Sequence, residues 1–476
     1  MTLKPSAYTR VWNPAGRRRF LKDFKDRVGP EPNLGVLEGP APSTEPLEGL
    51  DVAGMQQSPG MCPEVLSENW PAVLRSLRNS NFRLFWGGNF LSNIGTWMQN
   101  VALGWLVLTL TNSPFWLGVV SFVGSIPFLF FTLFGGVIAD RVNKRRLLLM
   151  TQSAMMLLAF ALALLAWLKG PDGHPLVNIW EIALISFFNG VAQAMNAPSY
   201  QALVPRLVPR EDLTNAIALN SAQFNLSRIL GPTLGGYAMA ALGVAGNFFL
   251  NGVSFLAVLG ALFQIHYPED APVLHESILN SLASGLRYVR RHPQMFVLVW
   301  IICTSSLLFF PFLSFIPWFV RNKLHQGEHV YGLMLAASGL GSVIGAALVA
   351  WRGTFHHRGR IIPFSAASVM LILIVFCNST TLWLSEACMF LEGFGMILAL
   401  SAITVAMQEL ASDQMRGRAM SIYATAFLGL PPLGALAAGA LSVHFPTQIV
   451  LSSMLALAAI LFLSIYAASP ALRQLD

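Results

Sequence analysis

Between Phe115 and Leu168 the chain reads FWLGVVSFVGSIPFLFFTLFGGVIADRVNKRRLLLMTQSAMMLLAFALALLAWL, which is two long apolar runs on either side of a short basic segment. Each run is long enough to cross the roughly 30 Å hydrocarbon core of a bilayer as a helix. Neither run alternates apolar with polar residues, as a strand of a membrane barrel does. Because lipid tolerates only helices and closed barrels, the pattern predicts two membrane helices joined at the membrane surface.

The same pattern recurs from Phe82 almost to the end of the chain. Apolar runs of roughly 20 residues, each long enough to span a bilayer, are separated by short breaks. We expect spans near residues 84–110, 115–139, 146–168, 177–199, 215–241, 246–266, 294–319, 330–351, 361–378, 382–406, 418–442 and 446–468. The sequence therefore predicts an all-α membrane protein with twelve transmembrane helices.

The composition agrees with this class and excludes others. Only 11% of the 476 residues are charged and 54% are hydrophobic, and the mean hydropathy is +0.58, which excludes a soluble enzyme, a disordered protein and a fibrous one. The net charge of +7 first points to nucleic acid, but a DNA-binding protein would cluster its Lys and Arg in polar modules. The four cysteines are too scattered for a disulfide framework or a zinc site, so we expect no metal and no cofactor.

Most positive charges fall on one side of the predicted membrane. The outer loops hold only Lys169, Arg321 and Lys323, whereas every other Lys or Arg after residue 70, except Arg228, lies in or beside an inner segment. Inner loops of membrane proteins carry an excess of positive charge. We therefore expect a multi-pass protein of the inner or plasma membrane with both termini in the cytoplasm.

The chain divides into four regions. Residues 1–81 are rich in Pro, Gly, Glu and Ser and predict a mostly disordered cytoplasmic tail, either a regulatory or lipid-contacting element or a dispensable extension. Residues 82–266 and 294–476 form two six-helix halves. Residues 267–293 form a cytoplasmic linker with an amphipathic helix.

The two halves are related by a weak internal repeat. At an offset of 203 residues Gly231 falls on Gly434 and Gly236 on Gly439, and near the second span of each half an offset of 214 places Gly118 on Gly332. Two such halves around a central site favour transport by alternating access, in which one half rocks against the other.

The loop after the second span carries the most specific motif. It reads GGVIADRVNKRR from Gly135 to Arg146, and it resembles the G-x-L-A-D-R-x-G-R-R/K signature of the major facilitator superfamily. The resemblance covers the chain from about Phe82 onward and implies a gating role for this loop. The implied gating residues are Gly136, Asp140, Arg141, Lys144 and Arg145, with Arg416 and Arg418 at the start of the eleventh span.

Two departures from that motif bear on the gate. Asn143 replaces the second glycine of the family signature, and because Asn tolerates left-handed backbone we expect the turn to be kept. The equivalent loop of the second half has Thr354 where Asp140 would map, so we expect the lock to be one-sided. The alternative for the basic cluster by itself is ordinary positive-inside topology.

The fifth span contains a second motif, Gly231-Pro232-Thr233-Leu234-Gly235-Gly236. It resembles the G-P-x-x-G-G motif of exporters in the same superfamily, in the drug:proton antiporter branch that includes enterobactin exporters and macrolide efflux proteins. In such a motif Pro and Gly bend the helix and permit close packing. The alternative is generic helix crossing, since small residues are common in membrane helices.

Two charges lie in the middle of predicted spans, Arg228 in the fifth and Glu392 in the tenth. Charges inside a membrane are costly and are functional candidates by default. Glu392 is the best candidate for a group that exchanges a proton, and Arg228 can hold an anionic substrate group or a carboxylate. The alternative is that both are structural and pair with helix carbonyls or with each other.

Polar residues form stripes on three spans of the first half, and we expect them to contact substrate. The candidates are Asn89 and Asn93 on the first span, Asn189 and Gln193 on the fourth, and Asn225 on the fifth. In lipid such stripes must face protein or water, so they line a cavity or hold helices together by hydrogen bonds. The matching faces of the second half are more apolar, which suits an amphipathic cargo.

Together these features predict a secondary active transporter, a proton-coupled exporter of an amphipathic small molecule such as a drug, siderophore or metabolite. We expect no catalytic residues, a monomer in the lipid bilayer, a small-molecule substrate and protons as partners, and no nucleic acid. The sequence contains no phosphate-binding G-x-x-x-x-G-K-[ST] loop and no H-E-x-x-H cluster, which disfavours an ATP-driven pump and a membrane enzyme. The alternative is a non-transporting receptor or assembly factor on a transporter scaffold.

Overall fold

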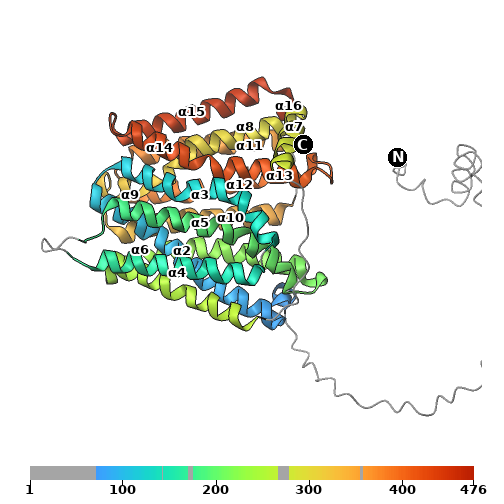
Figure 1. Ribbon diagram of the computed structural model, residues 1–476. Helices are drawn as coiled ribbons and strands as arrows, with labels where there is room; N and C mark the ends of the chain where they lie inside the picture. Colours follow the sequence, from blue (N-terminus) through green and yellow to red (C-terminus); the bar gives the residue numbers. More distant parts are fainter. Residues whose placement is uncertain (1–70, 142, 170–174, 266–277, 354–356, 476) are drawn as a thin grey trace, which may run out of the picture. The chain divides into compact units, whose positions relative to one another are not determined.

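The structure is a computed structural model that describes residues 71–141, 143–169, 175–265, 278–353 and 357–475. Side chains are not described for some residues within these ranges, chiefly 131–141 and 278–282. The described part is helical (Figure 1). The predicted tail lies mainly outside it, although Ala72–Arg78 forms a short 3₁₀ helix, η3, within the range predicted for the tail.

The helices follow the predicted spans closely. Those of the first half are α2 (Ser80–Thr111), α3 (Pro114–Arg141), α4 (Lys144–Trp167), α5 (Ile179–Leu203) and α6 (Leu213–Gln264). The linker contains α7 (Ile278–Arg291). The second half consists of α8 (Pro293–Thr304), η6 (Ser305–Phe309), α9 (Pro311–Asn322), α10 (Glu328–Arg352), α11 (Arg358–Asn378), α12 (Leu382–Leu410), α13 (Arg416–Gly429), α14 (Pro431–Leu441) and α15 (Thr447–Ala468), with a final short α16 (Pro470–Arg473).

Helix α6 contains two spans that meet at a kink. Gly243 has φ +70° and ψ 178° within the 52 residues of α6, a left-handed region that residues with a side chain rarely adopt. Eight described segments are long and apolar enough to cross a membrane. One of them contains α6, and because α6 holds two spans, the eight segments account for nine crossings. Helices α2, α3 and α5, of 32, 28 and 25 residues, complete the twelve crossings.

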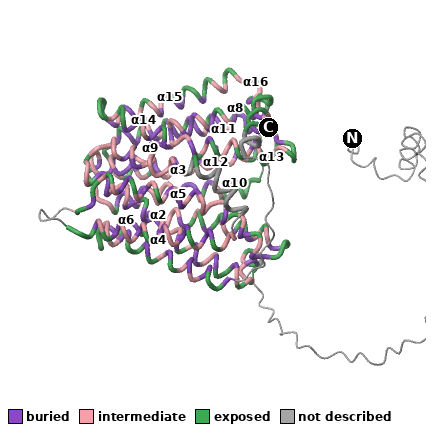
Figure 2. The backbone as a smooth tube through the Cα atoms, viewed as in Figure 1, coloured by how far each residue is buried: buried purple, intermediate pink, exposed green. Residues whose placement is uncertain are grey.

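The described chain begins and ends at the same end of the helix bundle, as an even number of crossings requires. In Figure 1 the start of the described chain (blue) and the C-terminus both lie at the right-hand end. We call this the terminal end of the bundle and the opposite one the distal end. Along most helices buried and exposed residues alternate, so that each helix turns one face inward (Figure 2).

Large apolar side chains cover much of the outer surface. Leu157, Phe249, Trp383 and Ile460 are each more than half exposed. Exposed apolar surface of this extent is avoided by soluble monomers. On a bundle of spanning helices it is the surface that lipid covers.

Within each half, glycines bring helix backbones close together. A side chain on Gly88 of α2 would collide with the backbone of α6 at Ala257 and Val258. In the second half Gly341 of α10 packs on the backbone of α12 at Phe390. Small residues permit this close packing in membranes, where helix association rests on van der Waals contact.

The two halves meet along two pairs of helices. Helix α3 packs on α14, and α6 packs on α10. At the first pair Gly118 contacts Gly439, and at the second Gly236 contacts Gly332. In the internal repeat Gly118 is equivalent to Gly332, and Gly236 is equivalent to Gly439. The contact between Gly118 and Gly439 is therefore equivalent to the contact between Gly332 and Gly236. This is the pairing that a pseudo-two-fold axis between two six-helix halves produces.

Candidate functional site

A cavity of about 590 Å³ lies between the two halves. Helices α2, α3, α4 and α5 of the first half and α9, α10 and α13 of the second contribute to its wall. Its volume falls within the range typical of small-molecule sites. The two halves differ in what they contribute.

The first half contributes all the carboxamide side chains of the described cavity wall, together with aliphatic residues such as Val120 and Leu162. Gln99 and Asn100 of α2 and Asn189 and Gln193 of α5 line the cavity. Gln99 is held from behind, because Asn251 Nδ2 on α6 donates a 2.7 Å hydrogen bond to its Oε1. This part of the cavity can donate and accept hydrogen bonds.

The wall from the second half is mainly apolar. Leu313 of α9, Leu335 and Tyr331 of α10 and Leu428 of α13 line it. A polar contact across the cavity joins Ser121 Oγ of α3 and Ser314 Oγ of α9, which lie 3.3 Å apart. The carboxamides of the described wall therefore all lie on the side of the first half, and the side of the second half is mainly apolar.

The halves are held together on the distal side of the cavity. Arg321 of α9 donates a 3.2 Å hydrogen bond to the carbonyl oxygen of Leu108, near the C-terminal end of α2. Trp105 of α2 stacks on Tyr331 of α10 at a centroid distance of 6.2 Å. Cations are stabilised at helix C-termini, so Arg321 adds an electrostatic contact to this closure.

Arg228 and Glu392 lie nearer the terminal end than the cavity. Ser338 Oγ on α10 donates a 2.6 Å hydrogen bond to Glu392 Oε2, and Gly339, the next residue of α10, packs on the backbone of α6 at Arg228. Ser338 follows the cavity residue Leu335 by about one helical turn. Among described residues no direct ion pair joins Arg228 to Glu392, but the two residues contact consecutive residues of α10.

The predicted polar stripes fulfil two different roles. Asn189 and Gln193 lie in the cavity wall. Asn89 is buried and donates to Tyr200 Oη on α5 at 3.2 Å, and that hydroxyl donates to Asn220 on α6. Asn89 therefore helps to hold three helices together.

The remaining stripe residues lie away from the described wall of the cavity. Asn225 donates to the backbone oxygen of Ser221 within α6. Asn93 is half-buried on α2, toward the terminal end from the cavity residue Trp97.

The motif of the fifth span forms contacts on both sides of α6. Gly231 packs on Trp97 and Gly235 on Met98, both on α2, while Gly236 packs on α10. Pro232 is buried, and its carbonyl oxygen contacts Gly332 of α10. The motif thus permits close contact within the first half and between the halves.

The loop motif is only partly described. Gly136, Asp140 and Arg141 belong to α3, but their side chains lie outside the described residues. Lys144 begins α4 and is half-buried. Arg145 donates to the carbonyl oxygens of Leu262 and Phe263 at 2.7 and 2.8 Å.

Asn143 keeps the turn by a different means from the one expected. Its φ is −53°, outside the left-handed region, and its side chain accepts a hydrogen bond from the Arg146 backbone N–H. The expected left-handed backbone is therefore wrong. Asn143 is instead the N-cap of α4, a position that Asn favours strongly.

The basic residues of the eleventh span contact their own surroundings. Arg416 forms an ion pair of 2.7 Å with Asp413 and donates to the Gln408 carbonyl oxygen. Arg418 Nη1 donates to Ser284 Oγ on α7 at 3.1 Å. Arg418 therefore connects the linker helix to the start of α13.

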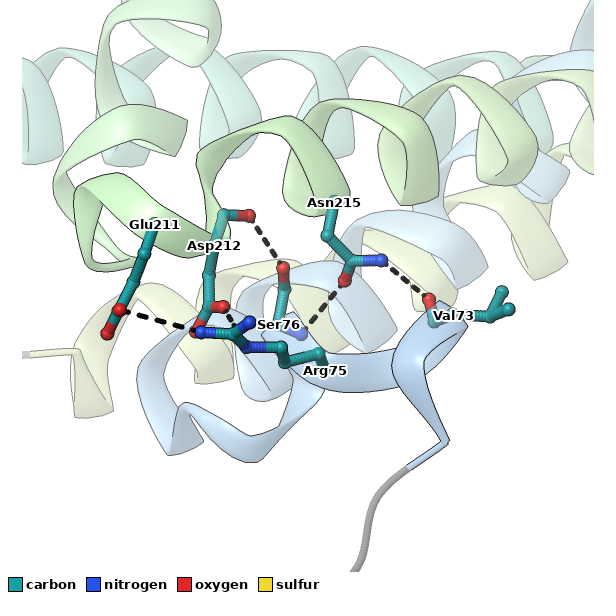
Figure 3. A network of polar contacts seen from close by, with 6 residues as sticks. All are labelled: Val73, Arg75, Ser76, Glu211, Asp212 and Asn215. Atoms are coloured by element: carbon teal, nitrogen blue, oxygen red, sulfur yellow. Dashed lines mark hydrogen bonds and ion pairs between the residues drawn. The ribbon is translucent and has the colours of Figure 1, made fainter.

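A polar network at the terminal end holds η3 on the loop before α6 (Figure 3). Arg75 Nε lies 2.6 Å from Asp212 Oδ1, and Arg75 Nη2 lies 3.6 Å from Glu211. Ser76 donates to Asn215 from its backbone and to the Asp212 carbonyl oxygen from its hydroxyl, each at 2.9 Å. Asn215 also donates to the Val73 carbonyl oxygen at 2.9 Å.

The sequence did not reveal this network, nor the roles of Gln99 and Arg321, because each of these contacts depends on which helices become neighbours.

Comparison with known families now identifies the fold. Residues 72–476 match the family model described as transmembrane secretion effector. The chain belongs to this family of major facilitator superfamily transporters. The match confirms the resemblance expected from the loop and fifth-span motifs, and a protein of this family is a transporter and not an enzyme.

Characterised relatives cover most of the membrane core. The staphyloferrin A transporter of Staphylococcus aureus (strain NCTC 8325 / PS 47) is 25% identical over 74% of this chain and 87% of its own length. The multidrug efflux pump Tap of Mycolicibacterium fortuitum is 24% identical over 73% and 86%. The enterobactin exporter EntS of Citrobacter koseri is 24% identical over 79% and 88%.

Solved structures confirm the predicted fold class. A bacterial homolog to the human lysosomal transporter Spinster, in an inward-facing and occupied conformation, superposes with a TM-score of 0.63 at 13% identity. The superposition covers 85% of this chain and 99% of that one. The chain is therefore an all-helical, multi-pass membrane protein with the major facilitator fold.

Proposed function

We propose that this protein is a proton-coupled exporter that moves an amphipathic small molecule out of the cell by alternating access. The observation that carries the proposal is a cavity between two pseudo-symmetric halves that are joined on its distal side. The proposal is supported by relatives that are named as a staphyloferrin A transporter, a multidrug efflux pump and an enterobactin exporter. The proposed location is the inner or plasma membrane, with both termini in the cytoplasm and the protein acting as a monomer.

The proposed coupling site is Glu392 with Arg228. These two residues come from different halves and lie on either side of α10, close to the cavity residue Leu335. Gain of a proton by Glu392 would remove its attraction to Arg228 and so weaken one link between the halves. One charge moving across 100 mV of membrane potential supplies about 2.3 kcal/mol, enough to shift a two-state equilibrium about fortyfold.

The proposal includes a gate at the terminal end. Family resemblance assigns this role to Gly136, Asp140, Arg141, Lys144 and Arg145, and the described contacts of Arg416 and Arg418 place two cations at the start of α13. Formation of the gate would close the cavity to the cytoplasm while the distal contacts open.

The test uses the full chain in proteoliposomes with a pH gradient and the amphipathic dye Hoechst 33342 as cargo, at an alkaline external pH at which the dye is largely uncharged. Protein-free liposomes under the same gradient give the passive accumulation of this weak base, which is subtracted. We expect gradient-driven dye accumulation, and we expect Glu392→Gln to abolish it because that side chain cannot exchange a proton. Dye exchange without a gradient should persist in this variant, which separates coupling from folding. Ser385→Ala, a change at another buried polar residue of α12 whose hydroxyl bonds its own helix, is the control. Full gradient-driven accumulation by Glu392→Gln would refute the coupling site, and no transport by the native chain would favour a non-transporting receptor.

A further inference from the structure

The cavity wall contains no ionisable side chain of Asp, Glu, Lys, Arg or His among the residues that the structure describes. Arg228 and Glu392 lie outside the described wall, nearer the terminal end. A charged group that leaves water needs an opposite charge close by, or its transfer is strongly unfavourable. This cavity offers a charged cargo no such partner.

What the cavity offers instead is a set of neutral carboxamides. Gln99 is only 4% exposed, and its Oε1 is occupied by the hydrogen bond from Asn251. That bond leaves the Nε2 end of the amide as the donor on the cavity side, and no partner for Nε2 is found among the described residues. Nε2 is not among the buried side-chain atoms that lack a partner, so it is accessible, and water or a ligand in the cavity can supply its acceptor.

The α5 side of the wall supplies further carboxamides. Asn189 and Gln193 line the cavity and lie one turn apart on α5, so their amides face the same side of the helix. Asn189 Oδ1 is itself buried and has no hydrogen-bond partner among the described residues. A ligand placed here meets the carboxamides of α2 and α5, a group type that both donates and accepts hydrogen bonds.

The opposite wall fixes the other half of the ligand. Leu313, Leu335 and Leu428 present hydrocarbon to the cavity. From these features, and resting on the proposed transport function, we propose that the cargo is an uncharged amphiphile with hydroxyl or amide groups along one edge. Anionic cargoes rich in carboxylate or sulfate groups are excluded from this cavity, and Gln99 is a residue that determines specificity.

The test measures equilibrium binding to the full chain in lipid nanodiscs, with protein-free nanodiscs as background. The probes are tritiated estradiol, which is neutral and carries two hydroxyl groups, and two unlabelled competitors. Estradiol 3-sulfate adds a negative charge, and androstane is a steroid hydrocarbon without polar groups. We expect estradiol to bind at least about tenfold more tightly than either competitor, the factor that one lost hydrogen bond to a buried group costs.

Two variants localise the preference. Gln99→Leu should lower estradiol affinity about tenfold and leave or improve androstane binding, which also shows that the variant is folded. Gln223→Leu is the control, because Gln223 is also a buried glutamine but lies on α6, outside the described cavity wall. It should leave the ratio of the two affinities unchanged.

Tighter binding of estradiol 3-sulfate than of estradiol would overturn the inference, and so would the absence of binding by all three probes. An equal loss of estradiol affinity in Gln99→Leu and Gln223→Leu would also overturn it. Such a result would leave the proposed function standing if a pH gradient still drives dye accumulation. Conversely, the expected preference without gradient-driven transport would keep the binding site and refute the export function.

Discussion

Arg321 shows how a single residue that looks peripheral can join the two halves. In the sequence it is one of three basic residues of the outer loops, whereas in the structure its guanidinium lies at the C-terminal end of a helix from the other half. The contact is with the backbone oxygen of Leu108, so no charge pattern could reveal it. Its environment depends entirely on how the two halves pack.

Replacing Arg321 by Gln should loosen the distal closure. A cation at a helix C-terminus contributes about 0.3–1 kcal/mol, so the population open at this end should rise about two- to fivefold. The measurement is the rate at which a membrane-impermeant maleimide, added from the distal side, labels Ser121→Cys in a background without native cysteines. Lys323→Gln is the control, because Lys323 at the same end bonds Gln448 within its own half. Equal labelling rates in the two variants would contradict the role of Arg321.

Gln99 illustrates which site residues the sequence could not supply. The predicted candidates of α2, Asn89 and Asn93, lie outside the described cavity wall, whereas Asn100, two helical turns after Asn93, lies in it. Gln99 lies beside Asn100 and is turned toward the cavity by Asn251 on α6. Sequence periodicity identifies a polar face, but the rotation of each helix about its axis is set by tertiary packing.

At the scale of elements, the span boundaries were predictable because membrane thickness limits helix length. The sequence repeat predicted that these glycines are equivalent in the two halves, and the structure shows that they form the contacts between the halves. Gly118 and Gly439 bring α3 and α14 together, and Gly236 and Gly332 bring α6 and α10 together. The seventh span is interrupted, and Pro311 is the sequence signal for this break because proline removes a backbone donor from a helix. The form of the break, the π-helical turn η6 between α8 and α9, is rare and was not predicted.

The element η3 provides a second test, because its attachment depends on one well-placed carboxylate. Asp212 has a side chain 12% exposed and lies 2.6 Å from Arg75, whereas Glu211 is 71% exposed and lies at 3.6 Å. Exposed ion pairs contribute little, and half of Arg75 faces solvent, so we expect Asp212→Asn to destabilise the docking of η3 by about 0.5–1 kcal/mol.

The measurement for η3 is the rate of tryptic cleavage at Arg75 and Arg78 in the reconstituted protein. Asp212→Asn should raise this rate about two- to fivefold, while Glu211→Gln, the same chemical change on the neighbouring residue, should have a smaller effect. A larger effect of Glu211→Gln would show that another contact holds η3 in place.

At the scale of the whole molecule, the predicted fold rests on two features that reinforce each other. The positive charges predict on which side each loop lies, and the repeat predicts that the halves are related by an axis through the membrane. The carboxamide wall comes from the first half and the leucine wall from the second. Movement of one half against the other would therefore separate the carboxamides from the leucines, so a bound amphiphile would lose its contacts with one of the two halves as the cavity opens.

Alternating access requires that the distal contact between Ser121 and Ser314 breaks in every cycle. Their hydroxyl oxygens lie 3.3 Å apart on opposite halves, close enough for a disulfide after substitution by cysteine. In a background without native cysteines, Ser121→Cys with Ser314→Cys should form this bond on oxidation. Transport of Hoechst 33342 should then fall by at least about tenfold, because a covalent link prevents separation of the halves, and should recover on reduction. Each single cysteine variant, oxidised in the same way, is the control. Unchanged transport by the fully cross-linked protein would contradict alternating access through the distal end. The cavity would then release its cargo while the two halves stay joined there.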